Sequence, residues 1–311
     1  MDVDAVSDGD ITVIGGIMEH IEEAGIHSGD SACVLPPHTL SDEIINEIRE
    51  HTCAISKELQ VKGLLNIQFA VKNDTVYVLE VNPRASRTTP FVSKATGVAL
   101  AKIAAMVMVD KKLSEIGFIE EKKLSRIAVK ESVLPFSRFS GVDILLGPEM
   151  KSTGEVMGIG KSFGVAFYKS QIAAGAALPK EGNVFVSVKN DDKRGFVFIA
   201  KKLCDMGFKI IATEGTAKVL NSNNIETEII SKIGKGSKDI LDLMKNNKID
   251  LIINIPSGAV GQTDIKPIRS MAVMYGIPCI TTIQGAQAAV NGLETVLKHG
   301  FSVESLQECI K

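Results

Sequence analysis

The stretch Gln68–Arg87 reads QFAVKNDTVYVLEVNPRASR and decides how the first part of the chain folds. Two runs that alternate apolar and polar residues flank an Asn-Asp pair at 73–74, which predicts a β-hairpin. Side chains two apart on a strand share a face, so Glu80 and Asn82 point the same way and Gln68 can join them from the partner strand. One carboxylate and two amide oxygens suit Mg²⁺ or Mn²⁺ rather than Zn²⁺.

Two arginines, Arg84 and Arg87, follow the hairpin, and both can clamp phosphate oxygens. Because Mg²⁺ is usually held by one or two carboxylates plus substrate phosphates, the stretch predicts metal–nucleotide chemistry. No glycine-rich phosphate loop with a lysine precedes it, so we expect only half of such a site in this chain. The structural alternative is a set of polar residues on the solvent-facing side of a hairpin, followed by surface arginines.

The residues on either side of this stretch predict an α+β module. Residues 2–20 place two apolar runs around a polar turn, which predicts either a short edge strand or part of a fold whose upstream half lies on another polypeptide. A helix is expected from about Thr39 to Leu59, with hydroxyl groups available as caps. Further helices are expected at 101–113 and 162–173, with Met106, Met108 and Val109 of the first in the core.

From Val184 the pattern changes to five β-α units after a linker at 175–183. Such alternation predicts an open, Rossmann-like parallel sheet with helices on both faces, whose ligands bind at the carboxyl ends of the strands. The chain is therefore expected to be α/β, with an α+β module over 1–176 and a five-stranded domain over 177–311. The strands are expected at 184–188, 209–213, 225–230, 250–254 and 279–283.

Composition excludes several classes of protein. The 311 residues carry a formal net charge of −2, without the basic patch that nucleic acid requires. No apolar run reaches the ~18 residues that span a bilayer. The acidic N-terminus is unlike a signal peptide, and five scattered cysteines indicate a reducing compartment, so we expect a cytoplasmic protein without nucleic-acid or membrane partners.

A second candidate site lies at the carboxyl ends of the parallel strands. The tetrapeptide TEGT at 213–216 turns a strand into a helix, whose free N–H groups attract anions. Lys193, Lys232 and Asn254 also follow strands, so the set predicts a phosphorylated small molecule. No general base or nucleophile stands out, which favours a regulatory pocket. The alternative is an ordinary threonine cap with solvated lysines.

Several long motifs closely resemble the large chain of carbamoyl-phosphate synthase. They are 16–31 (GIMEHIEEAGIHSGDS), 66–72, 80–87, 90–98 and 145–158. The resemblance covers essentially the whole chain. The first part is similar to the back half of the second ATP-grasp module, and the second part to the methylglyoxal-synthase-like regulatory domain that ends that protein.

The resemblance implies a ligase that uses ATP to phosphorylate carbamate, feeding pyrimidine and arginine biosynthesis. By motif position, Gln68, Glu80 and Asn82 would bind the metal, and Arg84 and Arg87 would face phosphate and carbamate. The residues that would contact ATP are Gln68, Glu80 and, bordering the nucleotide, Gly25, Ile26, His27 and Ser28. A lone histidine such as His27 is more often a hydrogen-bonded structural residue than a general base.

The resemblance also implies two effector sites. A nucleotide effector would contact Lys193, Thr213, Thr216, Lys232 and Asn254. An ornithine-type effector would contact Glu22, Asp30, Glu131 and Thr281. Glu214 and Pro256 depart from the family pattern, so a uridine nucleotide, a purine nucleotide and phosphoribosyl pyrophosphate all stay open as the nucleotide effector.

The family's other ATP-binding residues would lie upstream of residue 1, so we expect the chain to be inactive alone. It would work with an upstream section of the large chain and a glutaminase small subunit; the alternative is a frameshifted or truncated reading frame. A non-catalytic effector-binding module and a different ATP-grasp ligase are the competing functions. Methylglyoxal synthase activity is disfavoured, because 258–262 (GAVGQ) offers no acid as general base.

Overall fold

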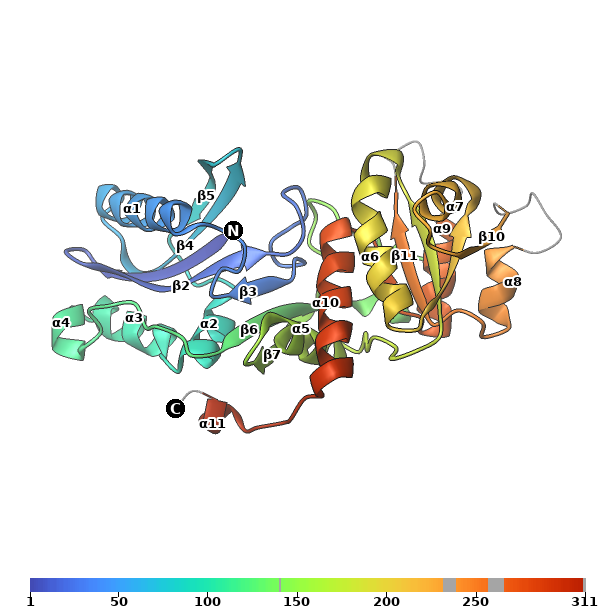
Figure 1. Ribbon diagram of the computed structural model, residues 1–311. Helices are drawn as coiled ribbons and strands as arrows, with labels where there is room; N and C mark the ends of the chain where they lie inside the picture. Colours follow the sequence, from blue (N-terminus) through green and yellow to red (C-terminus); the bar gives the residue numbers. More distant parts are fainter. Residues whose placement is uncertain (140, 232–238, 257–265, 310–311) are drawn as a thin grey trace.

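The computed structural model describes residues 1–139, 141–231, 239–256 and 266–309. Within these ranges the chain forms a seven-stranded antiparallel sheet followed by a five-stranded parallel sheet, each with helices packed against it (Figure 1). The predicted α/β fold class is therefore confirmed. Lys232, predicted to bind an effector, lies outside the described residues.

The seven-stranded sheet has the order β5-β4-β1-β2-β3-β6-β7. β1 pairs with both β2 and β4, and all seven of its residues are buried, so the edge-strand alternative for the N-terminal hairpin is wrong. The strands are β1 (Asp2–Asp8), β2 (Thr12–His20), β3 (Cys33–Leu35), β4 (Lys62–Lys72), β5 (Thr75–Asn82), β6 (Ile127–Val133) and β7 (Gly154–Gly160).

Helices cover both faces of this sheet. Ile44 and Ile48 of α1 (Asp42–Glu58) pack with β-strand residues such as Ile67, and Ser41 caps the helix by accepting a hydrogen bond from the Ile44 amide at 3.4 Å. The opposite core receives the short helices that follow the hairpin. The other helices of this part are α2 (Thr89–Thr96), α3 (Leu100–Met108), α4 (Leu113–Ile116), η1 (Pro135–Arg138) and α5 (Phe163–Ala173).

The helix expected at 101–113 ends early. α3 stops at Met108, and the side chains of Met108 and Val109 are 72% and 71% exposed, so their assignment to the core is wrong. No single helix among the described residues has the length and apolar character to cross a membrane; α2 and α3 meet that test only as a pair, and the pair is bent by 113°.

The five-stranded sheet has the order β10-β9-β8-β11-β12, with every strand parallel. Val184 and Val186 face one core and Phe185 faces the other, which explains why β8 is apolar on both sides. The strands are β8 (Asn183–Val188), β9 (Lys209–Thr213), β10 (Thr227–Ile230), β11 (Leu251–Ile255) and β12 (Cys279–Ile280). The helices are η2 (Asn190–Asp192), α6 (Lys193–Asp205), α7 (Glu214–Asn221), α8 (Ile240–Lys245), α9 (Lys266–Tyr275), α10 (Ile283–His299) and α11 (Leu306–Cys309).

α10 lies between the two sheets and packs against α5, so one hydrophobic core includes residues from both parts of the chain (Figure 1). The segment after α10 runs back beneath the first part. There the rings of Phe301 and Tyr168 lie 5.5 Å apart, and Glu304 pairs with Arg126 at 2.7 Å. The division of the chain at residue 177 stays a prediction.

Candidate functional site

The predicted hairpin is formed by β4 and β5, with Gln68 opposite Glu80. The turn residues Asn73 and Asp74 have φ values of 50° and 58°, which Asn and Asp tolerate better than most residues. β5 is an edge strand, and the Nδ2 of Asn82 donates to the Oε1 of Glu80 at 2.7 Å. The structure therefore brings the predicted carboxylate and one predicted amide into contact, with Glu80 exposed to solvent.

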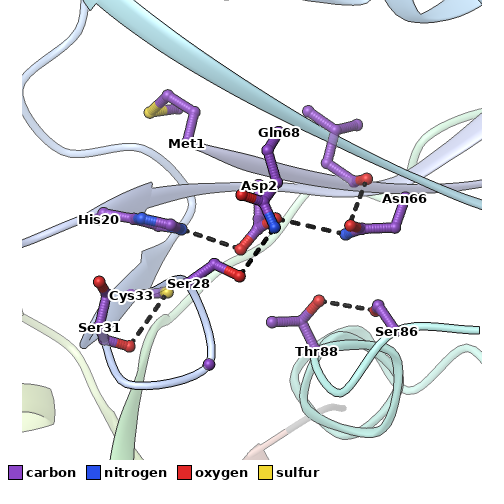
Figure 2. Close-up of polar contacts among 12 residues, drawn as sticks. Met1, Asp2, His20, Ser28, Ser31, Cys33, Asn66, Gln68, Ser86 and Thr88 are labelled. Carbon is purple, nitrogen blue, oxygen red and sulfur yellow. Dashed lines mark hydrogen bonds and ion pairs between the residues drawn. The ribbon is translucent and has the colours of Figure 1, made fainter. Parts of the chain in front are cut away.

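Gln68 connects the hairpin to the loop that was predicted to border a nucleotide. Its Nε2 donates to the Oγ of Ser28 at 2.8 Å, as Figure 2 shows. The Nζ of Lys130 donates to the Ser28 carbonyl at 3.3 Å, and Lys130 is only 2% exposed. No sequence pattern marks this lysine as buried, because a lysine on a strand is usually solvated.

The imidazole of His27 is engaged within its own loop. The Nδ1 accepts a hydrogen bond from the Gly29 amide at 3.0 Å, and the His27 amide donates to the Gly147 carbonyl at 2.8 Å. Gly25 has a φ of 114°, and Ile26 forms an isolated bridge with Ala24. These contacts fit a structural role for the histidine and give the loop a fixed backbone.

The two arginines lie in different environments. Arg87 forms an ion pair with Glu155 of β7, with Nη2 and Oε2 2.5 Å apart, and its Nη1 donates to the Ser152 Oγ at 2.9 Å. Arg84 is exposed, and its Nη1 donates to the Ala85 carbonyl at 3.0 Å. Arg87 is thus already oriented by the protein, whereas Arg84 is available to an incoming anion.

Asp4 fixes the loop that carries both arginines. Its buried carboxylate accepts hydrogen bonds from Ser86 Oγ at 2.7 Å, Thr88 Oγ1 at 2.7 Å and Asn66 Nδ2 at 3.0 Å. Figure 2 labels these three partners of Asp4. Burial raises the pKa of Asp4 to about 6, although these hydrogen bonds act in the opposite direction. Sequence reasoning missed this residue, because an acid near the start of a strand gives no sign of such partners.

Asp2, His20 and Cys33 form a second buried cluster beside Gln68 (Figure 2). Their potential ligand atoms lie within 4.8 Å of one another, and the Nε2 of His20 lies 2.9 Å from the Oδ2 of Asp2. Burial lowers the pKa of His20, but the Cys33 and Asp2 side chains outweigh it and raise that pKa to about 9. A metal ion would have to displace the proton of this imidazole before His20 could act as a ligand.

Two of the acids predicted to bind a cationic effector interact with each other. Burial, followed by the charge of Glu22, raises the pKa of Glu131 to about 8. Glu22 Oε2 accepts from the Ala32 amide at 2.7 Å. Asp30 instead accepts from the amides of Lys151 and Ser152 at 2.7 and 2.8 Å. Thr281 follows β12 directly, and its place beside these acids stays a prediction.

The second predicted site forms a polar row at the carboxyl ends of β9, β8 and β11. The Thr213 Oγ1 lies 3.5 Å from the Ser187 Oγ and 3.3 Å from the Thr216 Oγ1, and Ser187 pairs with Asn254 across the next strand. A Cβ added to Gly215 would lie 3.1 Å from the Nζ of Lys193, so this ammonium lies over the first turn of α7. Lys193, Thr213 and Thr216 therefore lie close together, and their role as effector ligands stays a prediction.

Asn254 adds a buried donor to this row. It is fully buried, and among the residues that the structure describes its Nδ2 has no hydrogen-bond partner. Its Oδ1 accepts from the Nη1 of Arg269 at 3.3 Å. Arg269 is itself 0% exposed, and Asp143, from the first part of the chain, holds its guanidinium with two hydrogen bonds of 2.6 Å. Ser187, Arg269 and Asp143 were not predicted.

Two family models match the two parts of the chain. Residues 1–116 match the family model described as carbamoyl-phosphate synthase L chain, ATP binding domain, and residues 195–281 match the model described as MGS-like domain. Among solved structures, the biotin carboxylase domain of a single-chain bacterial carboxylase is similar with a TM-score of 0.44 and 14% identity, over 57% of this chain and 46% of that one.

Relatives in other organisms match almost the whole chain. The carbamoyl phosphate synthase large chain of Archaeoglobus fulgidus is 56% identical over 309 residues, which are 99% of this chain and 29% of that protein. The large chain of Methanothermobacter thermautotrophicus is 53% identical over 99% of this chain and 29% of its own length. The chain thus spans about three tenths of the length of these curated relatives. It is similar to the C-terminal part of carbamoyl phosphate synthase large chains, and its match to the ATP binding domain model is followed by a match to the MGS-like domain model.

Proposed function

We propose that this chain supplies one wall of the ATP site at which carbamate is phosphorylated to carbamoyl phosphate, a product that feeds pyrimidine and arginine biosynthesis. The observation that carries the proposal is the contact between Gln68 and Ser28, which joins the candidate metal-binding hairpin to the candidate nucleotide loop. The similarity to large chains over almost the whole sequence supports the same function.

The donor set of the hairpin fits a magnesium or manganese ion. Glu80 offers a carboxylate, and Asn82 and Gln68 offer amide oxygens on the same hairpin. These are hard oxygen ligands, and the ion would neutralise charge on the phosphates of ATP. Arg84 would reach phosphate oxygens from solvent, and Arg87 would offer a guanidinium that Glu155 and Ser152 hold in place.

The ATP site would be completed by other polypeptide segments. The relatives are more than three times as long as the chain, so an upstream section of the large chain would supply the rest of the nucleotide pocket and a glutaminase small subunit would supply ammonia. Such a protein would work in the cytoplasm. On its own, the chain would show no turnover with ATP, bicarbonate and ammonia.

We further propose that the five-stranded domain binds a phosphorylated effector, such as a nucleotide. Positive potential for a phosphate would come from Lys193 and the N-terminus of α7. Hydroxyl groups would come from Thr213 and Thr216. The buried Asn254 is the observation that favours a ligand here, because its Nδ2 has no partner within the described ranges and a buried donor without a partner is costly. A cationic, ornithine-type effector would bind beside Glu22 and Glu131, and its positive charge would favour the ionised forms of these two carboxyl groups, whose pKa values are raised without it.

Manganese binding tests the hairpin. In a titration of the chain with Mn²⁺ and ATP, followed by electron paramagnetic resonance of the free ion, the wild type should bind Mn²⁺ and Glu80→Ala should lose at least about tenfold in affinity. The loss is expected because removing one carboxylate leaves two neutral amide ligands.

Glu120→Ala is the matched control, because Glu120 is an exposed acid outside the candidate site. Equal affinities for the wild type, Glu80→Ala and Glu120→Ala would contradict the metal assignment and leave a purely effector-binding module as the better function.

A further inference from the structure

The molecule contains a physical connection between its two candidate sites, and it starts at Arg269. This arginine is 0% exposed and belongs to α9 of the five-stranded domain. Its guanidinium bridges Asn254 of the polar row and Asp143, which lies 126 residues earlier in the chain. A buried guanidinium depends on its few partners for charge compensation, so its position is set by both of them.

Asp143 belongs to a connecting segment, 142–152, that joins η1 to β7. The first end of this segment is anchored on α9, since the Ser270 Oγ also donates to the Val142 carbonyl at 3.3 Å. The segment has no regular secondary structure among its described residues, so its path depends on side-chain contacts rather than on a backbone ladder.

The other end of the connecting segment is anchored on the candidate ATP site. The Gly147 carbonyl accepts from the His27 amide at 2.8 Å. The amides of Lys151 and Ser152 donate to Asp30, and the Ser152 Oγ accepts from Arg87 at 2.9 Å. The eleven residues of the connecting segment therefore link Asp143, the partner of Arg269, to the His27 loop and to Arg87.

From these contacts we propose that Asp143 and Arg269 are positioning residues. Their pair ties the connecting segment to the five-stranded domain and so sets the positions of Arg87 and of the His27 loop. The inference rests on the proposed ATP and effector sites. A phosphorylated ligand that accepts a hydrogen bond from the Asn254 Nδ2 would fix that amide, and with it Arg269, so occupancy of one site would bias the other.

Hydrogen–deuterium exchange of the whole chain, without ligand, tests the positioning role. In Asp143→Asn the amides in 145–153 and 25–31 should exchange at least about threefold faster than in the wild type. The reason is that the connecting segment loses its ion pair with Arg269 of α9, and the His27 loop contacts that segment. The double variant Asp143→Asn/Arg269→Gln should exchange no faster in these segments than the more affected single variant, because both changes remove one interaction.

Glu294→Gln is the matched control, since it removes two ion pairs inside the same domain, with Lys202 at 2.6 Å and with Lys298 at 2.7 Å, and Glu294 is far from the connecting segment in sequence. It should leave exchange in 145–153 unchanged. Unchanged exchange in Asp143→Asn, or a uniform increase across β8 and β11 as well, would overturn the proposal.

A second arm separates this proposal from the effector proposal. Uridine monophosphate and phosphoribosyl pyrophosphate are titrated by calorimetry, and the exchange experiment is repeated with any probe that binds. Binding that protects 145–153 in the wild type but not in Asp143→Asn supports the connection, and binding that leaves 145–153 unaffected in the wild type overturns the coupling. Adenosine monophosphate is titrated in the same way as a purine probe. If none of the three probes binds, the effector proposal fails, while the ligand-free result still decides the positioning role.

Discussion

At the scale of single residues, the candidate ATP site depends on buried charges that do not face the substrate. Asp4 receives three hydrogen bonds around the arginine loop, and Lys130 holds the carbonyl of Ser28. Burying a carboxylate is costly unless hydrogen bonds compensate for the lost water, and the hydroxyl and amide groups around Asp4 provide that compensation. The residues predicted to bind metal and ATP are therefore held in place by further buried residues, such as Asp4 and Lys130, that the sequence patterns did not identify.

The raised pKa of Asp4 makes stability depend on pH. Because this pKa is about 6 in the folded state and near 3.8 in the unfolded state, the folded protein binds more protons between these values. Asp4 should therefore lower the free energy of unfolding by on the order of 2 kcal/mol as pH rises from about 4 through about 6. Urea titrations across that range should show this decline in the wild type and lose it in Asp4→Asn.

Asp74→Asn is the control for that comparison, because Asp74 is an exposed aspartate in the hairpin turn. It should keep the pH dependence of the wild type. The same slope in Asp4→Asn and in the wild type would show that the carboxylate of Asp4 does not titrate as described.

At the scale of elements, sequence patterns predicted regular structure well and side-chain partners poorly. The hairpin and the parallel strands follow from alternation and from apolar runs, which are local properties. The short helix α2 was not predicted, because eight residues make little more than two turns and show little helical periodicity. The pair Asp143–Arg269 joins residues 126 positions apart, and neither residue differs locally from a solvated charge.

The contact between α5 and α10 leads to a prediction at this scale. A Cβ added to Gly164 would lie 2.8 Å from the Asn291 carbonyl and closer still to the Thr295 hydroxyl. Although alanine favours helices, Gly164→Ala should therefore destabilise the protein by about 1–3 kcal/mol through overpacking. The urea midpoint measures the loss.

Gly154→Ala provides the comparison for Gly164→Ala, because a Cβ at Gly154 would meet no atom within 4 Å. Its urea midpoint should stay close to that of the wild type. A Gly164→Ala variant as stable as Gly154→Ala would mean that the two helices separate without cost.

At the scale of the whole molecule, the two sheets are joined by more than the linker between them. α10 belongs to the second part in sequence but shares its core with α5, and the segment after it returns to pair Glu304 with Arg126. The sequence pattern marked a boundary near residue 177, because periodicity changes there. It gave no sign of these contacts, which join residues far apart in the chain.

The return of the C-terminal segment has a consequence for protease treatment. Lys180 is exposed in the linker, so limited trypsin digestion should nick the chain there. The two fragments should nevertheless elute together from a size-exclusion column, because cleavage at Lys180 leaves the apolar contacts between α5 and α10 intact. Fragments that separate in ordinary buffer would mean that the linker, rather than the shared core, holds the two parts of the chain together.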